Sequence, residues 1–484
     1  MNFMLDQVRR EASGLLDTQH RAKLGQYMTP SSIAEFMAGL FSYKNSAKLL
    51  DAGAGIGSLT AAFFEQAQRE KTSVVADTWE IDPVLGRYLR NTLDEYVLHG
   101  SGKIKARLHP TDFIEEVIFT IQSGAKPYTH AILNPPYKKI NAQSRHRKLL
   151  RMVGIETVNL YTAFVALALM LLEGKGELVA IIPRSFCNGS YYKPFRNFIL
   201  RHCAIRQLHL FDSRSQAFKD DDVLQENIII HLVKGETQNS IIVSTSRDGS
   251  FANYQQETFA ADDIIKASDT EQFIRIPTTT QDIHLPKLCT HTLSEIGLSV
   301  STGAVVDFRL KEYWCDAANP NAAPLIYPHH FSNGKLCWPK LHKKPNALQL
   351  SPIVSKNLLP SGHYILVKRF SSKEERRRIV AYHLSPDDLD AGYIGFENHW
   401  NVFHIKKQGM EESVAIGLAT FLNSTVLDNH FRVFSGHTQV NATDLRNMRY
   451  PDLTQLRMLG LRAKRASPKD QTSIDQLIEE LETL

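Results

Sequence analysis

The first half of the chain alternates between two hydrophobic patterns. Short apolar runs rich in β-branched residues are separated by longer stretches with helical spacing of apolar positions. The apolar runs predict strands at residues 47–51, 73–80, 103–108, 129–133, 177–182, 204–211 and 225–233. The other stretches predict helices at residues 58–69, from 83 onward and at 160–172. This alternation predicts an α/β domain built on a parallel sheet.

The alternation fades after residue 235. From there polar stretches, prolines and short mixed segments continue to the C-terminus, without an internal repeat or a low-complexity tract. We therefore predict two domains, at residues 1–235 and 236–484. The pattern leaves the secondary structure of the second domain largely unassigned.

Three glycines follow the first predicted strand. They are Gly53, Gly55 and Gly57 in the sequence DAGAGIG, which begins at Asp51. Glycine permits positive φ and close approach of a ligand to the backbone, and the helix that follows presents free N–H groups. The pattern predicts a nucleotide-binding loop; a purely structural tight turn is the alternative. It departs from the fingerprint GxGxxG, because Ser58 stands at the third glycine position.

Acidic residues follow the second and third predicted strands. Glu80 ends the second strand, where a carboxylate can accept two hydrogen bonds from a ribose, and Ile81 beside it can pack on an adenine face. Asp112 is placed to accept a hydrogen bond from an adenine amine, but a helix N-cap would look the same. A surface carboxylate at the strand end is the alternative for Glu80.

The tetrapeptide Asn134-Pro135-Pro136-Tyr137 follows the fourth predicted strand and is the strongest signal in the chain. An aromatic amine is a poor nucleophile, because its lone pair is delocalised into the ring. The side-chain oxygen of Asn134 and the carbonyl of Pro135 can accept its two N–H groups and stabilise the positive charge that grows during methyl transfer. The prolines stiffen the loop, and Tyr137 offers a ring face to an extruded base.

Composition describes a globular protein without a membrane span. Hydrophobic residues make up 43% and charged residues 22% of the 484 residues. The charged N-terminus lacks an apolar signal core, so we expect a cytoplasmic protein. Five scattered cysteines form no zinc pattern, and no motif predicts a metal or a covalent nucleophile.

Basic residues gather in three clusters, although the net charge is only +5. The clusters are Lys138, Lys139, Arg145, Arg147, Lys148 and Arg151; then Lys335, Lys340, Lys343 and Lys344; and then Lys368, Arg369, Lys373, Arg376, Arg377 and Arg378. Each cluster alone fits a solvated face. Three together favour a polyanionic partner, because cations gain affinity by releasing phosphate counterions. We take Lys138, Lys139, Lys343 and Lys344 as candidate substrate contacts.

Together these motifs resemble the N6-adenine DNA methyltransferases in which the cofactor loop precedes NPPY and target recognition comes last. The resemblance implies that residues 25–30, with Tyr27 and Thr29, contact the methionine part of S-adenosylmethionine. It assigns the Gly loop, Glu80 and Asp112 to the same cofactor, NPPY to catalysis and Phe218 to a second stacking role. Residues 434–441 resemble a segment of type II modification enzymes of the PstI/BsuBI kind.

The resemblance implies a Rossmann-like seven-stranded methyltransferase domain, followed by a mixed α+β target-recognition domain. The expected activity is adenine-specific methylation of double-stranded DNA by base flipping, in a type II restriction–modification system. A separate cognate endonuclease is an open question. The alternatives are an NPPY methyltransferase acting on ribosomal RNA or a protein glutamine, a chain that also cuts DNA, and a catalytically silent specificity subunit.

Overall fold

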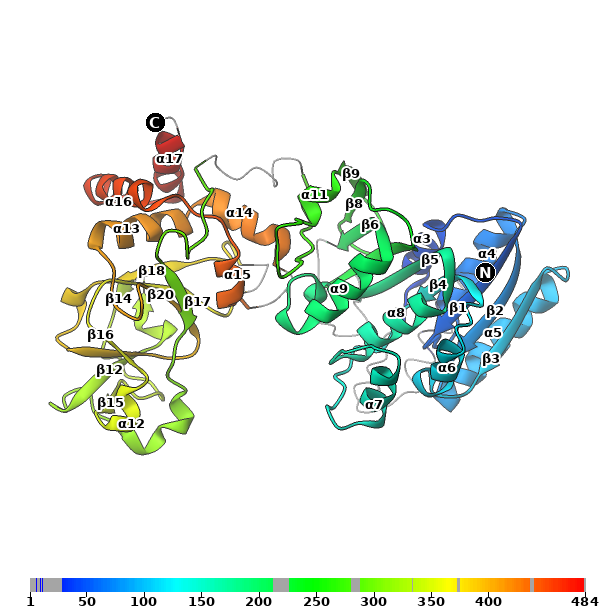
Figure 1. The fold of residues 1–484 in the computed structure, drawn as a ribbon, viewed down its shortest axis with the longest axis horizontal. Coiled ribbons are helices and arrows are strands. Elements are labelled where there is room, and N and C mark those ends of the chain that lie inside the picture. Colours follow the sequence, from blue (N-terminus) through cyan, green and yellow to red (C-terminus); the bar gives the residue numbers. More distant parts are fainter. Residues whose placement is uncertain are drawn as a thin grey trace. The chain divides into compact units, whose positions relative to one another are not determined.

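The computed structural model describes residues 28–211, 226–279, 288–332, 334–371, 375–435 and 439–482, together with residues 6, 9 and 11. The chain divides into two compact units, Met1–Thr280 and Gln281–Leu484 (Figure 1). Of the predicted site residues, Tyr27 and Phe218 lie outside the described residues, as do residues 25–26 and part of the 434–441 segment.

A nine-stranded sheet forms the centre of the first unit, in the order β3-β2-β1-β4-β5-β7-β6-β8-β9. The strands are β1 (Ser46–Ala52), β2 (Ser73–Trp79), β3 (Ile104–His109), β4 (Tyr128–Leu133), β5 (Leu172–Pro183), β6 (Cys203–Phe211), β7 (Asn227–Lys234), β8 (Ile241–Ser246) and β9 (Gln255–Phe259). Neighbouring strands from β3 to β5 are parallel, and β7 lies antiparallel between β5 and β6. The order in which successive strands are added to the sheet reverses between β1 and β4. Open α/β sheets bind ligands at such a point.

Helices pack on this sheet in two groups (Figure 1). The first group is α3 (Ser31–Gly39), α4 (Ser58–Arg69) and α5 (Pro83–His99); the second is α6 (Phe113–Gln122), α7 (Arg145–Met152), α8 (Leu160–Leu171) and α9 (Lys193–His202). Local sequence sets the helix starts. The Asp82 carboxylate caps α5 by accepting from the N–H groups of Val84 and Leu85, and Pro83 occupies the first turn, where its missing N–H costs nothing.

The seven predicted strands are present, and two further strands, β8 and β9, extend the same sheet. The compact unit extends to Thr280, beyond the expected boundary at residue 235, because β8 pairs in parallel with β6 and β9 continues the sheet. The short α11 (Ala261–Ile264) also belongs to it. Phe251 from this added segment stacks on Phe36 of α3, with ring centroids 4.3 Å apart. Residues 236–280 are therefore part of the first unit's core.

The second unit combines short strands with helices, as the mixed α+β expectation stated. One sheet has the order β10-β20-β17-β18, a second β11-β15-β12-β19-β16, and β13 pairs with β14. The strands are β10 (Ser299–Thr302), β11 (Trp314–Cys315), β12 (Ala322–Ile326), β13 (Phe331–Ser332), β14 (Lys335–Leu336), β15 (Ala347–Gln349), β16 (Leu358–Pro360), β17 (Tyr364–Lys368), β18 (Ala381–Leu384), β19 (Tyr393–Phe396) and β20 (Trp400–His404). The helices are α12 (Pro352–Ser355), α13 (Glu412–Leu422), α14 (Thr425–Phe434), α15 (Ala442–Arg446), α16 (Leu453–Ala466) and α17 (Gln471–Glu482).

Within the described part of the chain, every helix is too short or too polar to cross a membrane.

Candidate active site

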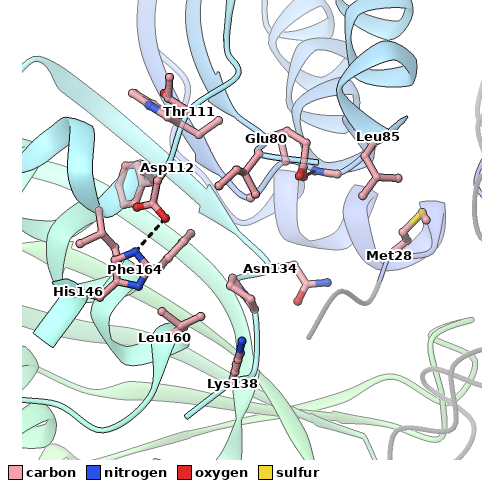
Figure 2. Close-up of a pocket in the computed structure, with 18 of the residues that line it drawn as sticks. Met28, Glu80, Leu85, Thr111, Asp112, Asn134, Lys138, His146, Leu160 and Phe164 are labelled. Carbon is pink, nitrogen blue, oxygen red and sulfur yellow. Dashed lines mark hydrogen bonds and ion pairs between the residues drawn. The ribbon is translucent and has the colours of Figure 1, made fainter. Parts of the chain in front are cut away.

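A cavity of about 450 Å³ opens at the carboxyl ends of β1, β2, β3 and β4. Its lining includes most of the predicted site: Thr29, Gly53, Gly55, Glu80, Ile81, Asp112, Asn134, Pro136, Lys138 and Lys139. Figure 2 shows the labelled side chains of Glu80, Asp112 and Asn134 around this space. Parallel strands bring loops distant in sequence to one edge, so the topology assembles the site.

The Gly loop is held against the end of β2. The N–H groups of Gly53 and Ala54 both donate to the Trp79 carbonyl, each at a distance of 2.9 Å. Gly57 then precedes α4 with φ of 90°, and a Cβ at this position would lie 2.8 Å from Leu89. Glycine at position 57 is therefore required by the turn and by its packing on α5.

Glu80 is a buried carboxylate at the cavity wall. One oxygen accepts from the Gly55 N–H at 2.9 Å and the other from the Asp82 N–H at 2.8 Å. Burial raises the pKa of Glu80 to about 7, although these two hydrogen bonds favour the charged form. Each oxygen keeps a second lone pair that can accept from a ligand.

Asp112 fulfils both alternatives left open by the sequence, because it caps a helix and also lines the cavity. One oxygen accepts from the Glu115 N–H at the start of α6, and the other lies 3.0 Å from Nε2 of His146 on α7 (Figure 2). Burial alone would raise the pKa of Asp112, but the hydrogen bond with His146 and the bond from Glu115 hold it below its usual value. No sequence motif marks His146, since this contact depends on α7 folding against α6.

The Asn134 amide is fixed from two sides. Its nitrogen donates to the Thr29 hydroxyl at 3.0 Å, and its oxygen accepts from the Tyr137 hydroxyl at 3.0 Å. The Tyr137 hydroxyl also lies 3.0 Å from the carbonyl of Ile181 on β5. Segments from three parts of the first unit therefore set the plane of this amide.

Apolar side chains form the remaining wall of the cavity. Ile81 is exposed at the site, as expected for a residue that packs on a ligand ring. Leu160 and Phe164 of α8 join it, and both were missed because the apolar pattern of α8 marks its core face and its cavity face alike. The cavity thus combines acidic groups with an apolar surface.

Several predicted residues do not line the cavity. Asp51 is fully buried and accepts from the Thr60 hydroxyl at 2.6 Å. Burial raises its pKa to about 7. Asn134 and Pro136 line the cavity, whereas Pro135 and Tyr137 are not among its lining residues. Lys343 and Lys344 belong to the second unit.

The first basic cluster is less uniform than its sequence indicates. Arg145 pairs with Glu115, and Arg147 and Arg151 pair with Glu156, which lies beyond the cluster in sequence. Lys138 and Lys139 are exposed at the cavity. The arginines therefore stabilise α7, while the two lysines stay available to a ligand.

Comparison with known proteins places this geometry in a family. A family description of Eco57I restriction-modification methylases matches residues 86–218. The type II methyltransferase M.BsuBI of Bacillus subtilis is 46% identical over 99% of this chain and 97% of its own length. M.PstI of Providencia stuartii is 42% identical over 99% and 96%. The chain belongs to the type II DNA methyltransferases. The resemblance stated from the motifs is confirmed.

The first unit of this type II methyltransferase has an α/β fold built on a nine-stranded mixed sheet. Among solved structures, a DrdV–DNA complex matches 91% of this chain and 57% of its own chain, with a TM-score of 0.51 and 11% sequence identity. At that identity the likeness concerns the fold alone. Because the match covers 91% of the chain, it includes residues of both compact units.

Proposed function

We propose that this type II methyltransferase transfers a methyl group from S-adenosylmethionine to the N6 amine of adenine within a specific sequence of double-stranded DNA. It would act as the modification enzyme of a restriction–modification system, and therefore in the cytoplasm. The observation that carries the proposal is the Asn134 amide, clamped between Thr29 and Tyr137 at the rim of the cavity.

The cavity fits the cofactor by size and by chemistry. Its volume of about 450 Å³ lies in the range of small-molecule sites. Glu80 would accept from the ribose hydroxyls, Asp112 from the adenine amine, and exposed Ile81 would pack on the adenine ring. Gly53, with φ of 75°, leaves room for the ligand beside Phe164 and Pro136. When bound, the cofactor supplies an electrophilic methyl group on a sulfonium.

Asn134 and Pro135 would bind the target amine. The Asn134 side-chain oxygen and the Pro135 carbonyl would accept hydrogen bonds from its two N–H groups. These hydrogen bonds would strengthen as positive charge develops on the nitrogen. The amide nitrogen of Asn134 donates to Thr29, so the amide oxygen is the atom that would accept from the target amine. Little reorganisation is needed, because both acceptors stand in a proline-stiffened loop.

The target adenine would reach these acceptors by base flipping, since N6 is inaccessible within the stack. Tyr137 would stack on the extruded base, and its hydroxyl would keep the Asn134 oxygen in position. Phe218 keeps its assignment as the second stacking ring. Lys138 and Lys139 at the cavity and Lys343 in the second unit would contact phosphates.

Lys344 forms an ion pair within the second unit. Its ammonium group lies 2.6 Å from the carboxylate of buried Asp307. We therefore assign Lys344 to holding its loop, and Lys343 to the DNA.

Mass spectrometry of nucleosides tests the proposal directly. Duplex DNA is incubated with the enzyme and labelled S-adenosylmethionine, then digested, and label is expected in N6-methyl-2′-deoxyadenosine. Asn134→Ala is expected to abolish transfer while calorimetry still detects cofactor binding. Glu80→Ala serves as the reverse control, because it should weaken cofactor binding first. Label in methylcytosine, in RNA or in protein would refute the assignment.

A further inference from the structure

Two segments of the second unit meet at a single ion pair and expose an unusual mixture of side chains. The ion pair joins Lys344, in the loop between β14 and β15, to Asp307, in the segment between β10 and β11. Phe308 and Arg309 follow Asp307 in the sequence, and Leu341 and Lys343 precede Lys344. We call these four residues the Phe308–Leu341 surface. None of these four residues belongs to the site described above.

The apolar members of this surface are presented to solvent. Leu341 is fully exposed, and Phe308 is 61% exposed. The Arg309 guanidinium lies 5.8 Å from the centre of the Phe308 ring. Leaving such side chains in water costs free energy that burial against a partner would recover.

The loop that carries Leu341 is firmly anchored. The Asn346 side chain accepts from the Lys340 N–H and donates to the Lys340 carbonyl, each at a distance of 3.0 Å. The Trp338 indole N–H donates to the Asn346 carbonyl at 2.9 Å. Leu341 is thus held outward by a braced loop, which lowers the entropy lost on binding.

The charge of this region is positive. Among the described residues, Arg309 and Lys343 have no acidic partner within ion-pair distance. Burial, and then the neighbouring His342 and the charges of Lys340 and Lys344, lower the pKa of His329 to about 4. Glu312 and Asp316 are exposed acids that follow in the first segment.

We propose that the Phe308–Leu341 surface binds duplex DNA, with Arg309 and Lys343 on phosphates and Phe308 and Leu341 on bases. Cations position a protein on DNA without reading sequence, whereas apolar side chains contact thymine methyl groups and base steps in the grooves. The proposal rests on the proposed function in two respects, namely that the partner is DNA and that Lys343 contacts its phosphates.

The test compares apolar and cationic variants of the full-length enzyme. Phe308→Ala with Leu341→Ala is expected to weaken binding of a duplex carrying the recognition sequence about tenfold, since two apolar contacts are lost. The matched control is Phe119→Ala with Leu98→Ala, which removes side chains that are 68% and 77% exposed on α6 and α5. The control is expected to bind as the wild type does. Leu341→Gln, which keeps the size but not the apolarity, should share the loss.

Salt dependence separates the two kinds of contact. The apolar variant should keep the wild-type slope of log affinity against log salt, because it releases no counterion. Arg309→Ala and Lys343→Ala should each flatten the slope by about one. On heparin, a polyanion without bases, only the cationic variants should elute earlier.

Each failure has its own signature. The proposal would be overturned if the apolar variant bound DNA as tightly as the control does. It would also be overturned if the apolar variant lost as much heparin retention as the cationic variants. Self-association of the wild type that the apolar variant abolishes would assign the surface to a second copy, and would also overturn it. A wild-type enzyme that methylates no DNA would instead refute the proposed function.

Discussion

At the scale of residues, the cavity is built from polar groups that are each held by two partners. Asn134 is fixed by Thr29 and Tyr137, and Glu80 by two backbone N–H groups. Asp112 is fixed by His146 and a helix N–H. Preorganised groups need little rearrangement when charge develops, so small changes in their partners should have kinetic effects.

Tyr137→Phe separates the two roles of this ring. The ring remains for stacking, but Asn134 loses the hydroxyl that holds its oxygen. We expect kcat to fall about tenfold, as for a lost hydrogen bond of about 1.4 kcal/mol in the transition state, with little change in the Kd for DNA. Single-turnover kinetics and fluorescence anisotropy measure the two quantities. Tyr137→Ala should impair both, and an unchanged kcat in Tyr137→Phe would contradict the positioning role.

Glu80 makes cofactor affinity depend on pH. Its pKa is raised to about 7 by burial, so the carboxylate takes up a proton as the pH falls from 8 to 6. The neutral acid is the weaker acceptor, and cofactor affinity should therefore decline over this range. Calorimetric titration at several pH values checks it, and Glu80→Gln should bind weakly with little pH dependence.

Asp51→Asn is the control for that titration, because Asp51 also has a pKa raised to about 7. Its charge contributes to raising the pKa of Glu80, so the variant should move the affinity profile to slightly lower pH. If the pH dependence of cofactor affinity were abolished in Asp51→Asn and kept in Glu80→Gln, the titrating group would be Asp51 and the assignment to Glu80 would be wrong.

His146→Ala should raise the KM for S-adenosylmethionine several-fold and leave kcat within about twofold. Without the hydrogen bond from His146, burial dominates the pKa of Asp112, which then rises. The increase in KM should thus be larger at pH 5.5 than at pH 8. His146→Gln, which can still donate to the carboxylate, should recover part of the loss, whereas a pure fall in kcat would contradict the assignment.

At the scale of elements, sequence pattern predicts best where strands are buried on both faces. The apolar runs of β4, β5 and β7 were recognised because such strands read as continuous hydrophobic stretches. β9 was missed, since four of its five residues are exposed at the edge of the sheet. The strands of the second unit have two to five residues and pair across long separations, so no local period marks them.

Two helices of the second unit, α13 and α16, touch through glycines. A Cβ at Gly417 would lie 1.8 Å from the Leu456 carbonyl oxygen, so the backbones must separate to admit it. We expect Gly417→Ala to destabilise the protein by about 1–3 kcal/mol, measured by thermal unfolding. Gly86→Ala is the control, because Gly86 lies in α5 with open space around it, and should stabilise by about 0.5–1 kcal/mol.

At the scale of the whole molecule, the sequence predicted two domains but placed the boundary too early. The hydrophobic alternation ends near residue 235, whereas the compact unit continues to Thr280. Gln207 and His209 of β6 hydrogen-bond to Ser244 of β8, which no pattern of apolar positions could indicate. Residue types near strand ends predicted many of the residues that line the cavity, while contacts between distant loops, such as His146 with Asp112, needed the fold.

The boundary predicts how fragments behave. Residues 1–280 should fold cooperatively and bind S-adenosylmethionine, because the sheet and its cavity are complete. Residues 1–235 would expose the edge of β6 and lose the Phe251 contact with Phe36. We expect this shorter fragment to aggregate or melt at a lower temperature, as circular dichroism would detect. Equal stability of both fragments would contradict the structural boundary.

The bond from the Gly55 N–H to Glu80 makes one carboxylate both a wall of the cavity and a brace for the loop opposite. Substituting it would remove a ligand contact and release the backbone that shapes the rest of the pocket. The measured loss would then exceed the energy of the contact itself, and only a double-mutant cycle against a cofactor analogue lacking the ribose hydroxyls could separate the two. Redesign of this enzyme for altered cofactors therefore has to change the loop and its brace together.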